Sequence, residues 1–230
     1  RNTDSAGELR TYSACPSVAD WERAFGEDDD VLAFTITSGL SGSFRAACAA
    51  KLNCEENSPS RRICIIDSLS TGPEIVLLIE KAVSELSAGA DFDAVCRSVQ
   101  DYQRRTHLIF ALESLHNLAQ NGRVGKLAAA AAGMLGIRAV GTTSDEGTLD
   151  LLGKCRGRKR AVDFLQEEME RLGYTGGCVR IGHCRNTDSA GELRTAILHR
   201  FPGANIRIYP LRGLCSYYAE CGGVLVGFEA

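Results

Sequence analysis

The sequence has no apolar run that approaches the roughly 20 residues a helix needs to span a bilayer. Its first residues also lack the apolar core of a secretory signal peptide, although the chain starts without Met. The formal net charge of -3 argues against nucleic acid as a partner held by bulk electrostatics. These absences predict a cytoplasmic protein without stable membrane insertion.

The ten cysteines form no Cys-x-x-Cys pair, so the sequence supports neither a zinc site of that type nor a thiol redox motif. Cys64, Cys96 and Cys178 lie within apolar runs and are expected to behave as small buried hydrophobic residues. This usage indicates a reducing compartment. The four histidines show no metal-ligand spacing, and we therefore expect neither a metal nor a cofactor.

Three common nucleotide and hydrolase motifs are also absent. The segment 122–126 resembles a phosphate loop only superficially, because Gln120 stands where a glycine is needed and Leu127 replaces the metal-binding hydroxyl residue. No Gly-x-Gly-x-x-Gly follows a strand, which leaves a dinucleotide site unsupported. The run 39–42 has the wrong spacing for the Gly-x-Ser-x-Gly elbow of hydrolases.

What the sequence does contain is a regular alternation of strand and helix patterns. Strands are predicted at 31–37, 62–66, 107–112, 137–143, 148–153, 178–183, 205–209 and 223–228. Helices are predicted at 18–25, 44–52, 73–88, 92–104, 113–120, 125–135, 158–172 and 188–200. In the third helix, Val76, Ile79, Val83 and Leu86 recur at helical spacing and predict its apolar face.

This pattern predicts two α/β domains, at 1–144 and 145–230. Strand alternates with helix in the first part, which is typical of a mainly parallel sheet. The hairpin signal at 145–147 and the later crossovers indicate a second, mixed sheet with helices on one face. A ligand is expected in the cleft between the two domains.

One segment of eleven residues occurs twice in the chain. Residues 1–11 recur as residues 185–195, and the match stops at Tyr12 against Ala196. An identical block without similar flanks is not typical of a repeat architecture. The second copy fits its context, after a strand and at the start of a helix, so we interpret the first as an artefact of cloning or sequence assignment. A mass spectrum of the intact chain and its N-terminal peptides tests this.

The stretch 31–44 carries the best candidate for a binding site. An apolar strand stops at hydroxyls and glycines, and an alanine-rich helix follows. Such a turn leaves free backbone N–H groups, which suit an anionic head group and are backed here by Thr37, Ser38, Ser41 and Ser43. The alternative is that Ser41 or Ser43 only caps the helix.

Two further features have a structural explanation beside a functional one. His183 ends a predicted strand and could reach the cleft, or it could have only a local structural role. The basic residues of segment 154–160 could dock an acidic or phosphorylated partner, or form a solvated charged face.

Six ordered motifs make the chain resemble the DegV family of fatty-acid-binding proteins. The hallmark is the run Thr-Ser-Gly-Leu-Ser-Gly-Ser-Phe at 37–44. The other matches lie at 13–17 (Thr-Ser-x-Pro-Ser in the family), 66–68 (Ile-Asp-Ser), 121–125 (Gly-Gly-Arg-Ile), 135–140 (Leu-x-Ile-Lys-Pro-Ile) and 154–157 (Lys-x-Arg). The resemblance covers most of the chain.

The resemblance implies two α/β domains that hold one long-chain fatty acid between them. Its carboxylate would be bound by Ser13, Ser38, Ser41 and the backbone of Gly42. Some bacterial members present the bound acid to a fatty acid kinase, which forms an acyl phosphate. The kinase then carries the ATP and the metal, and the family member itself is not catalytic.

This sequence departs from the family pattern in three places. The family's first strand, with its Asp-Ser-Thr signature, is absent, and roughly 50 residues are missing if ordinary α/β units precede this chain. The family's His-x-Gly-Pro-Gly is replaced by residues 220–223, which puts kinase coupling in doubt. Ser13 stands where the family commonly has Thr, a change that keeps the hydroxyl donor.

The acyl tail is expected to lie against Ile36, Met134, Leu135 and Ile137. Each buried CH₂ contributes about 0.8 kcal/mol, so a buried tail binds without any catalytic group. Two other hypotheses stay open. One is a serine-dependent acyl hydrolase with Ser41 as nucleophile, weakened by the lack of a recognisable base and acid around it. The other is a structural or regulatory module with an incidental lipid.

Overall fold

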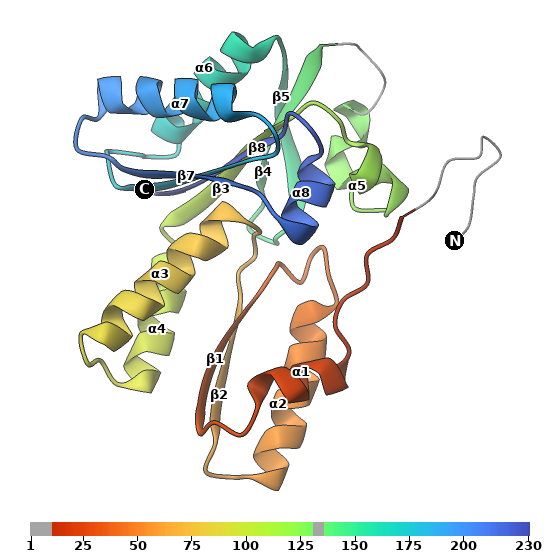
Figure 1. Cartoon of the computed structure of the whole chain (residues 1–230), viewed down its shortest axis with the longest axis vertical. Coiled ribbons are helices and arrows are strands. Elements are labelled where there is room, and N and C mark those ends of the chain that lie inside the picture. Colours follow the sequence, from red (N-terminus) through yellow and green to blue (C-terminus); the bar gives the residue numbers. More distant parts are fainter. Residues whose placement is uncertain (1–10, 131–135) are drawn as a thin grey trace, which may run out of the picture.

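The computed structural model describes residues 11–130 and 136–230, and it contains two sheets stacked end to end (Figure 1). The smaller sheet has two parallel strands, β1 (Asp30–Thr35) and β2 (Arg62–Asp67), paired in register from Asp30 and Arg62 onward. The larger sheet has six strands in the order β5-β4-β3-β8-β6-β7. The α/β class and the mixed sheet are confirmed.

The six strands of the larger sheet come from the second part of the chain. They are β3 (Thr106–Leu112), β4 (Ile137–Thr143), β5 (Leu149–Arg156), β6 (Cys178–His183), β7 (Asn205–Pro210) and β8 (Val224–Glu229). Only β6 and β7 are parallel to each other; β3, β4, β5 and β8 pair antiparallel with their neighbours. The expected domain boundary at residue 145 therefore falls inside this sheet, between β4 and β5.

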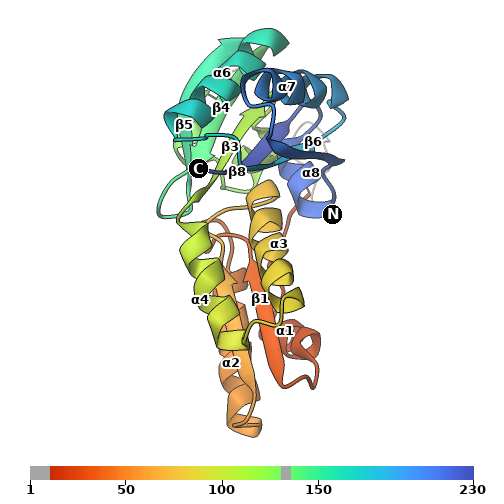
Figure 2. The same ribbon diagram turned by 90° about the vertical axis from the view of Figure 1, so that its left-hand side faces the viewer.

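Helices cover both faces of the smaller sheet (Figure 2). Helices α1 (Val18–Phe25) and α2 (Ser43–Asn57) pack on one face, and α3 (Pro73–Ser87) and α4 (Phe92–Gln103) pack on the other. Helix α1 begins where the sequence predicts, because the Ser17 hydroxyl and the Asp20 carboxylate form a reciprocal capping box.

Two long helices and several short ones flank the larger sheet. Helices α6 (Arg158–Arg171) and α7 (Thr187–Arg200) form the outer layer, as expected, with the largest apolar core beneath them. The inner face is covered by α5 (His116–Gln120), the 3-10 helix η1 (Gly125–Ala130) and α8 (Gly213–Ala219). The second copy of the repeat lies at the start of α7, whereas the first ten residues of the first copy lie outside the described residues.

Two predicted helices are shorter than expected. The helix predicted from Glu113 begins at His116, because 113–115 still form the turn after β3. The small-residue helix predicted over 125–135 is a 3-10 helix up to Ala130, and its remainder lies outside the described residues.

Helix α3 buries a different face from the predicted one. Ile79, Val83 and Leu86 are 40%, 55% and 46% exposed, whereas Leu77 and Leu78 are buried. The helix is apolar on more than one side, and its contacts with α4 and with the inner face of the larger sheet select the buried side. Helix α3 thereby bridges the two sheets.

An ion pair between a buried arginine and a half-buried glutamate connects α3 to the larger sheet. Arg180 on β6 is 2% exposed and donates from Nε to Glu80 of α3 over 2.8 Å. Its guanidinium also donates to the carbonyl of Asn205. A buried guanidinium needs both a counter-charge and acceptors for its other N–H groups, and this site supplies them.

Candidate functional site

The turn between β1 and α2 is attached to the larger sheet. Thr37 is fully buried, and its hydroxyl donates to the carbonyl of Gly147 over 2.8 Å while accepting from the N–H of Gly39. A Cβ on Gly39 would lie 2.8 Å from the carbonyl oxygen of Gly147, so only glycine permits this approach. The turn therefore lies at the junction of the two sheets.

The hydroxyl of Ser41 has a local role without being the helix cap. Helix α2 has Gly42 at its N-cap position, and no side chain caps it. Ser41 Oγ instead accepts from the N–H of Ser43 over 3.2 Å. Among the described residues, the N–H groups of Phe44 and Arg45 make no hydrogen bond. The start of α2 thus keeps free donors, as the sequence predicts.

The other two predicted head-group residues are Ser38, within this turn, and Ser13, in a loop that contacts it. The N–H of Ser38 donates to the carboxylate of Asp67 over 3.0 Å, which fixes the turn against the end of β2. The loop carrying Ser13 reaches the turn through Cys15, whose Sγ would lie 3.1 Å from a Cβ on Gly42. The structure therefore brings the loop at 13–17 and the turn at 37–43 together.

Ser13 also contacts helix α8. Its hydroxyl lies 2.5 Å from the hydroxyl of Tyr218, and its N–H donates to the side chain of Asn121 over 3.3 Å. Three segments far apart in the sequence thus converge on one place: the loop at 13–17, the segment after α5, and α8.

Arg123 is a functional candidate that the sequence analysis did not single out. Its Nε donates to the carbonyl of Leu40 over 3.0 Å, and its guanidinium lies 5.6 Å from the ring centroid of Tyr218. Arg123 is half-buried, and no carboxylate among the described residues forms an ion pair with it. The resemblance of 121–125 to a family motif was the available signal, but the neighbours of a cation depend on the fold. The arrangement offers a positive charge to an anionic ligand.

An apolar cavity extends from this place under the larger sheet. The empty space between its lining residues, including the part that is open to solvent, is about 620 Å³. Arg123 and Tyr218 stand among otherwise mostly apolar lining residues. These are Ile36, Leu40, Thr71, Leu108, Phe110, Leu112, Leu118, Leu149, Leu214, Cys215, Ala219 and Leu225. A flexible apolar chain with one charged end fits this chemistry.

Of the four residues predicted to contact the acyl tail, one lines the apolar cavity. Ile36 lines the cavity, and Ile137 is not among its lining residues. Ile137 lies at the start of β4, opposite Arg156 of β5. Met134 and Leu135 lie outside the described residues. Ser13, Ser38 and Ser41 do not line the apolar space themselves; Leu40 connects the turn to it, and Tyr218 connects Ser13.

A second, more polar hollow lies beside the end of β2 and the start of β3. Glu74 is among the residues that line it, although this residue is only 4% exposed. Thr106 donates its hydroxyl proton to the carboxyl of Glu74 over 2.7 Å. Burial raises the pKa of Glu74, although the hydrogen bond from Thr106 favours its charged form.

The remaining candidates have structural partners. His183 is buried, and its Nδ1 accepts from the N–H of Asn186. In the basic segment 154–160, Arg158 forms ion pairs with Asp188 and Glu192, and these carboxylates offset part of the positive charge of the segment. Glu220, in the segment that departs from the family pattern, accepts from the N–H of Asn117 at the start of α5.

No three His, Cys, Asp or Glu side chains within residues 11–130 and 136–230 are grouped so as to hold a metal ion. In the same part of the chain, no helix combines the length and apolar character needed to cross a membrane. All ten cysteines are free thiols.

Comparison with known proteins gives one consistent answer. A family model described as "uncharacterised protein, DegV family" matches residues 3–229. A DegV domain-containing protein of Streptococcus gordonii is 42% identical over 224 residues, which cover 97% of this chain and 80% of that protein.

Two solved structures are similar over nearly the whole chain. One is the Streptococcus pneumoniae Fatty Acid Kinase (Fak) B3 protein loaded with linoleic acid, with a TM-score of 0.93 and 42% identity, covering 97% of this chain and 80% of that one. The other is a DegV family protein from Eubacterium eligens loaded with heptadecanoic acid, with a TM-score of 0.90 and 40% identity, covering 94% and 79%.

Proposed function

Because the chain belongs to the DegV family, we propose that it binds one long-chain fatty acid at the junction of its two sheets. The tail occupies the apolar cavity under the larger sheet. The carboxylate lies by Ser13, Ser38, Ser41 and Gly42, with Arg123 as its counter-charge. The single observation that carries this proposal is an apolar cavity with an arginine at its edge that pairs with no described carboxylate.

The energetics of the site support a lipid ligand. Each methylene moved from water into the cavity contributes about 0.8 kcal/mol, so a long tail supplies most of the affinity. Hydrogen bonds to an ionised carboxylate add about 1.5–3 kcal/mol each and fix the orientation of the head group. No reactive group is needed for such binding.

The relationship to the pneumococcal kinase subunit supports a carrier role. We infer that the protein presents the carboxylate to a fatty acid kinase, which phosphorylates it to an acyl phosphate. The half-buried position of Ser13 and the exposure of Cys15 leave the head-group end within reach of a partner. The protein contributes no catalytic group or cofactor in this scheme, and its free thiols agree with a cytoplasmic location.

An acyl hydrolase is the weaker alternative. A nucleophilic serine needs a base within hydrogen-bond reach of its hydroxyl. The contact described for Ser41 Oγ is the one it accepts from the N–H of Ser43. No relative reported above is described as a hydrolase.

Mild extraction followed by native mass spectrometry tests the proposal. The expected result is a complex with one fatty acid per chain, and no release of product from an acyl ester. A second assay adds a fatty acid kinase and ATP, and acyl phosphate should form only when the loaded protein is present. Recovery of a chain that binds no fatty acid, even after incubation with oleate, would refute it.

A further inference from the structure

Phe110 is one of the residues that line the apolar cavity. It lies on β3 between Leu108 and Leu112, and all three side chains line the same space. Alternate residues of a strand point to one face and lie about 7 Å apart along it. Phe110 is therefore flanked on both sides by residues that would contact successive parts of an acyl tail.

The ring of Phe110 lies against the neighbouring strand. Phe110 is paired with Gly141 of β4 across the antiparallel ladder. A Cβ placed on Gly141 would lie 2.5 Å from Cζ and 2.6 Å from Cε2 of the ring. The ring thus occupies the volume that any other residue at position 141 would fill with its side chain.

The glycine also permits an irregular pairing on its other side. The register between β4 and β5 shifts between Val140 and Gly141. The same Cβ on Gly141 would lie 2.5 Å from the carbonyl oxygen of Asp150. A substitution at 141 therefore presses on the ring and on the backbone of β5 together, and the ring is the part that can rotate.

We propose that Gly141 and Phe110 together select the acyl chain, and this inference rests on the proposed function. Phe110 is the contact residue. Gly141 is the positioning residue. Because it has no side chain, the Phe110 ring can lie over β4 and does not fill the cavity. A side chain at 141 tips the ring into the cavity and shortens the longest saturated acyl chain that fits.

The expected effect follows from the burial of single methylenes. Each methylene that gains or loses a dry position changes the affinity about fourfold. If the Phe110 ring moves into the space that the acyl tail occupies, the order of affinities changes within a series of fatty acids that differ only in length. The carboxylate contacts at Ser13 and Arg123 are untouched.

The test is a competition among saturated fatty acids from lauric to arachidic acid, offered in equal amounts to the delipidated full chain. Native mass spectrometry reads the distribution of bound acids. Phe110→Leu should move the distribution toward longer acids, and Phe110→Trp toward shorter ones. Gly141→Ala should also favour shorter acids, and the double variant Gly141→Ala/Phe110→Leu should restore the longer ones.

Phe228→Leu is the matched control. Phe228 is a fully buried phenylalanine on the opposite face of the same sheet, outside the cavity lining. It should lower stability without changing the distribution of bound acids. If Gly141→Ala fails to fold because of the contact with Asp150, the two Phe110 variants decide the matter.

An unchanged distribution in both Phe110 variants would overturn the inference and leave fatty-acid binding intact. A wild-type chain that binds none of the acids would overturn the proposed function instead. The two failures are therefore distinguishable in one experiment.

Discussion

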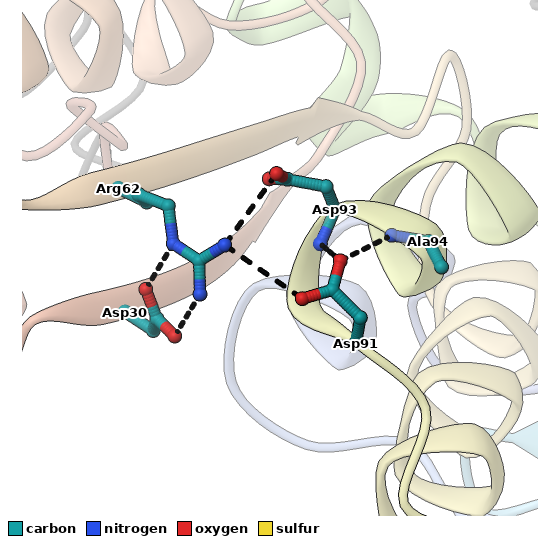
Figure 3. A network of polar contacts seen from close by, with 5 residues as sticks. All are labelled: Asp30, Arg62, Asp91, Asp93 and Ala94. Atoms are coloured by element: carbon teal, nitrogen blue, oxygen red, sulfur yellow. Dashed lines mark hydrogen bonds and ion pairs between the residues drawn. The ribbon is translucent and has the colours of Figure 1, made fainter.

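The two sheets are stabilised in different ways. The six-stranded sheet has a continuous apolar core under α6 and α7, with buried residues from every strand but β7, whose Ile206 and Ile208 are half-buried and pack against it. The two strands of the smaller sheet share two separate small clusters, one on each face. At the end of the smaller sheet where both strands begin, exposed charged side chains pair across β1, β2 and the start of α4 (Figure 3). The smaller sheet contributes the turn at 37–43 to the junction with the larger one.

The charge network of the smaller sheet centres on Arg62. Its guanidinium donates to Asp30 of β1 over 2.6 Å and 2.7 Å, and it also pairs with Asp91 and Asp93 at the start of α4 (Figure 3). The Arg62 guanidinium lowers the pKa of Asp30. Water screens such exposed pairs, so the network orients strands and a helix more than it stabilises them.

The largest expected effect is in the core of the larger sheet. Leu193→Ala removes a fully buried side chain and should lower the free energy of unfolding by about 2–5 kcal/mol. Ile63→Ala is the matched change in the smaller sheet, where half-buried neighbours can relax toward the space it leaves. Urea unfolding measures both. An equal or larger loss for Ile63→Ala would break the comparison.

Arg123→Gln should separate ligand binding from folding. Loss of hydrogen bonds to a charged carboxylate costs about 1.5–3 kcal/mol, or a roughly 10- to 150-fold weaker affinity. The stability of the ligand-free protein should change little, because Arg123 forms no ion pair with any carboxylate of the described residues. Titration with a fluorescent fatty acid measures the affinity, and Arg104→Gln, an exposed change outside the apolar cavity, is the control. Equal affinities for the two variants would remove Arg123 from the site.

Glu74 at the junction should impose a pH dependence. Burial raises its pKa in the folded protein, so the unfolded chain loses the proton first as pH rises. Its contribution to stability is complete below the ordinary glutamate pKa and is lost as pH rises through the folded pKa. Glu74→Gln should flatten that decline in a series of urea titrations.

Glu85 on the same helix provides the control of opposite sign. A hydrogen bond from Lys81, with a second from Ser98, lowers its pKa. Its contribution is present above the ordinary glutamate pKa and is lost as pH falls through the folded pKa. If Glu85→Gln and Glu74→Gln alter the pH profile in the same direction, burial is not what controls Glu74.

The smallest effect is expected at Arg62. Arg62→Gln should reduce stability only slightly, and the difference from the wild type should shrink further in high salt. Thermal unfolding in low and high salt measures it. A large, salt-independent loss would mean that the far end of the smaller sheet is held as firmly as the core of the larger one.

Local patterns in the sequence predicted most elements but not their assignment to sheets. The β3 segment was recognisable as a strand, yet it lies between β4 and β8, and β8 begins at Val224, more than 100 residues after β3 begins at Thr106. The hydrophobic periodicity of a segment does not reveal which distant strand it pairs with. For α3 the difficulty was the opposite, because an apolar helix offered two faces and tertiary contacts chose between them.

The candidate site could be predicted from the sequence where its residues are contiguous. The turn at 37–43 and the loop at 13–17 were identified through family motifs, and the structure places them side by side. Arg123 and Tyr218 were not selected, because their value lies in what surrounds them: a carbonyl of Leu40, an aromatic face and an apolar cavity. Ile137 was selected for its apolar character, which does not reveal whether a residue faces the ligand or its own sheet.

The contact between Thr37 and Gly147 gives the site a mechanical property. The turn that contributes hydroxyls and free N–H groups is carried by the smaller sheet, but it is fastened to the β4–β5 hairpin of the larger one. A ligand held by the turn and by the cavity therefore crosses the seam between the two halves. Any ligand that binds only the joined form stabilises it in proportion to the logarithm of its concentration. A bound ligand of this kind would also hold the smaller and the larger sheet together.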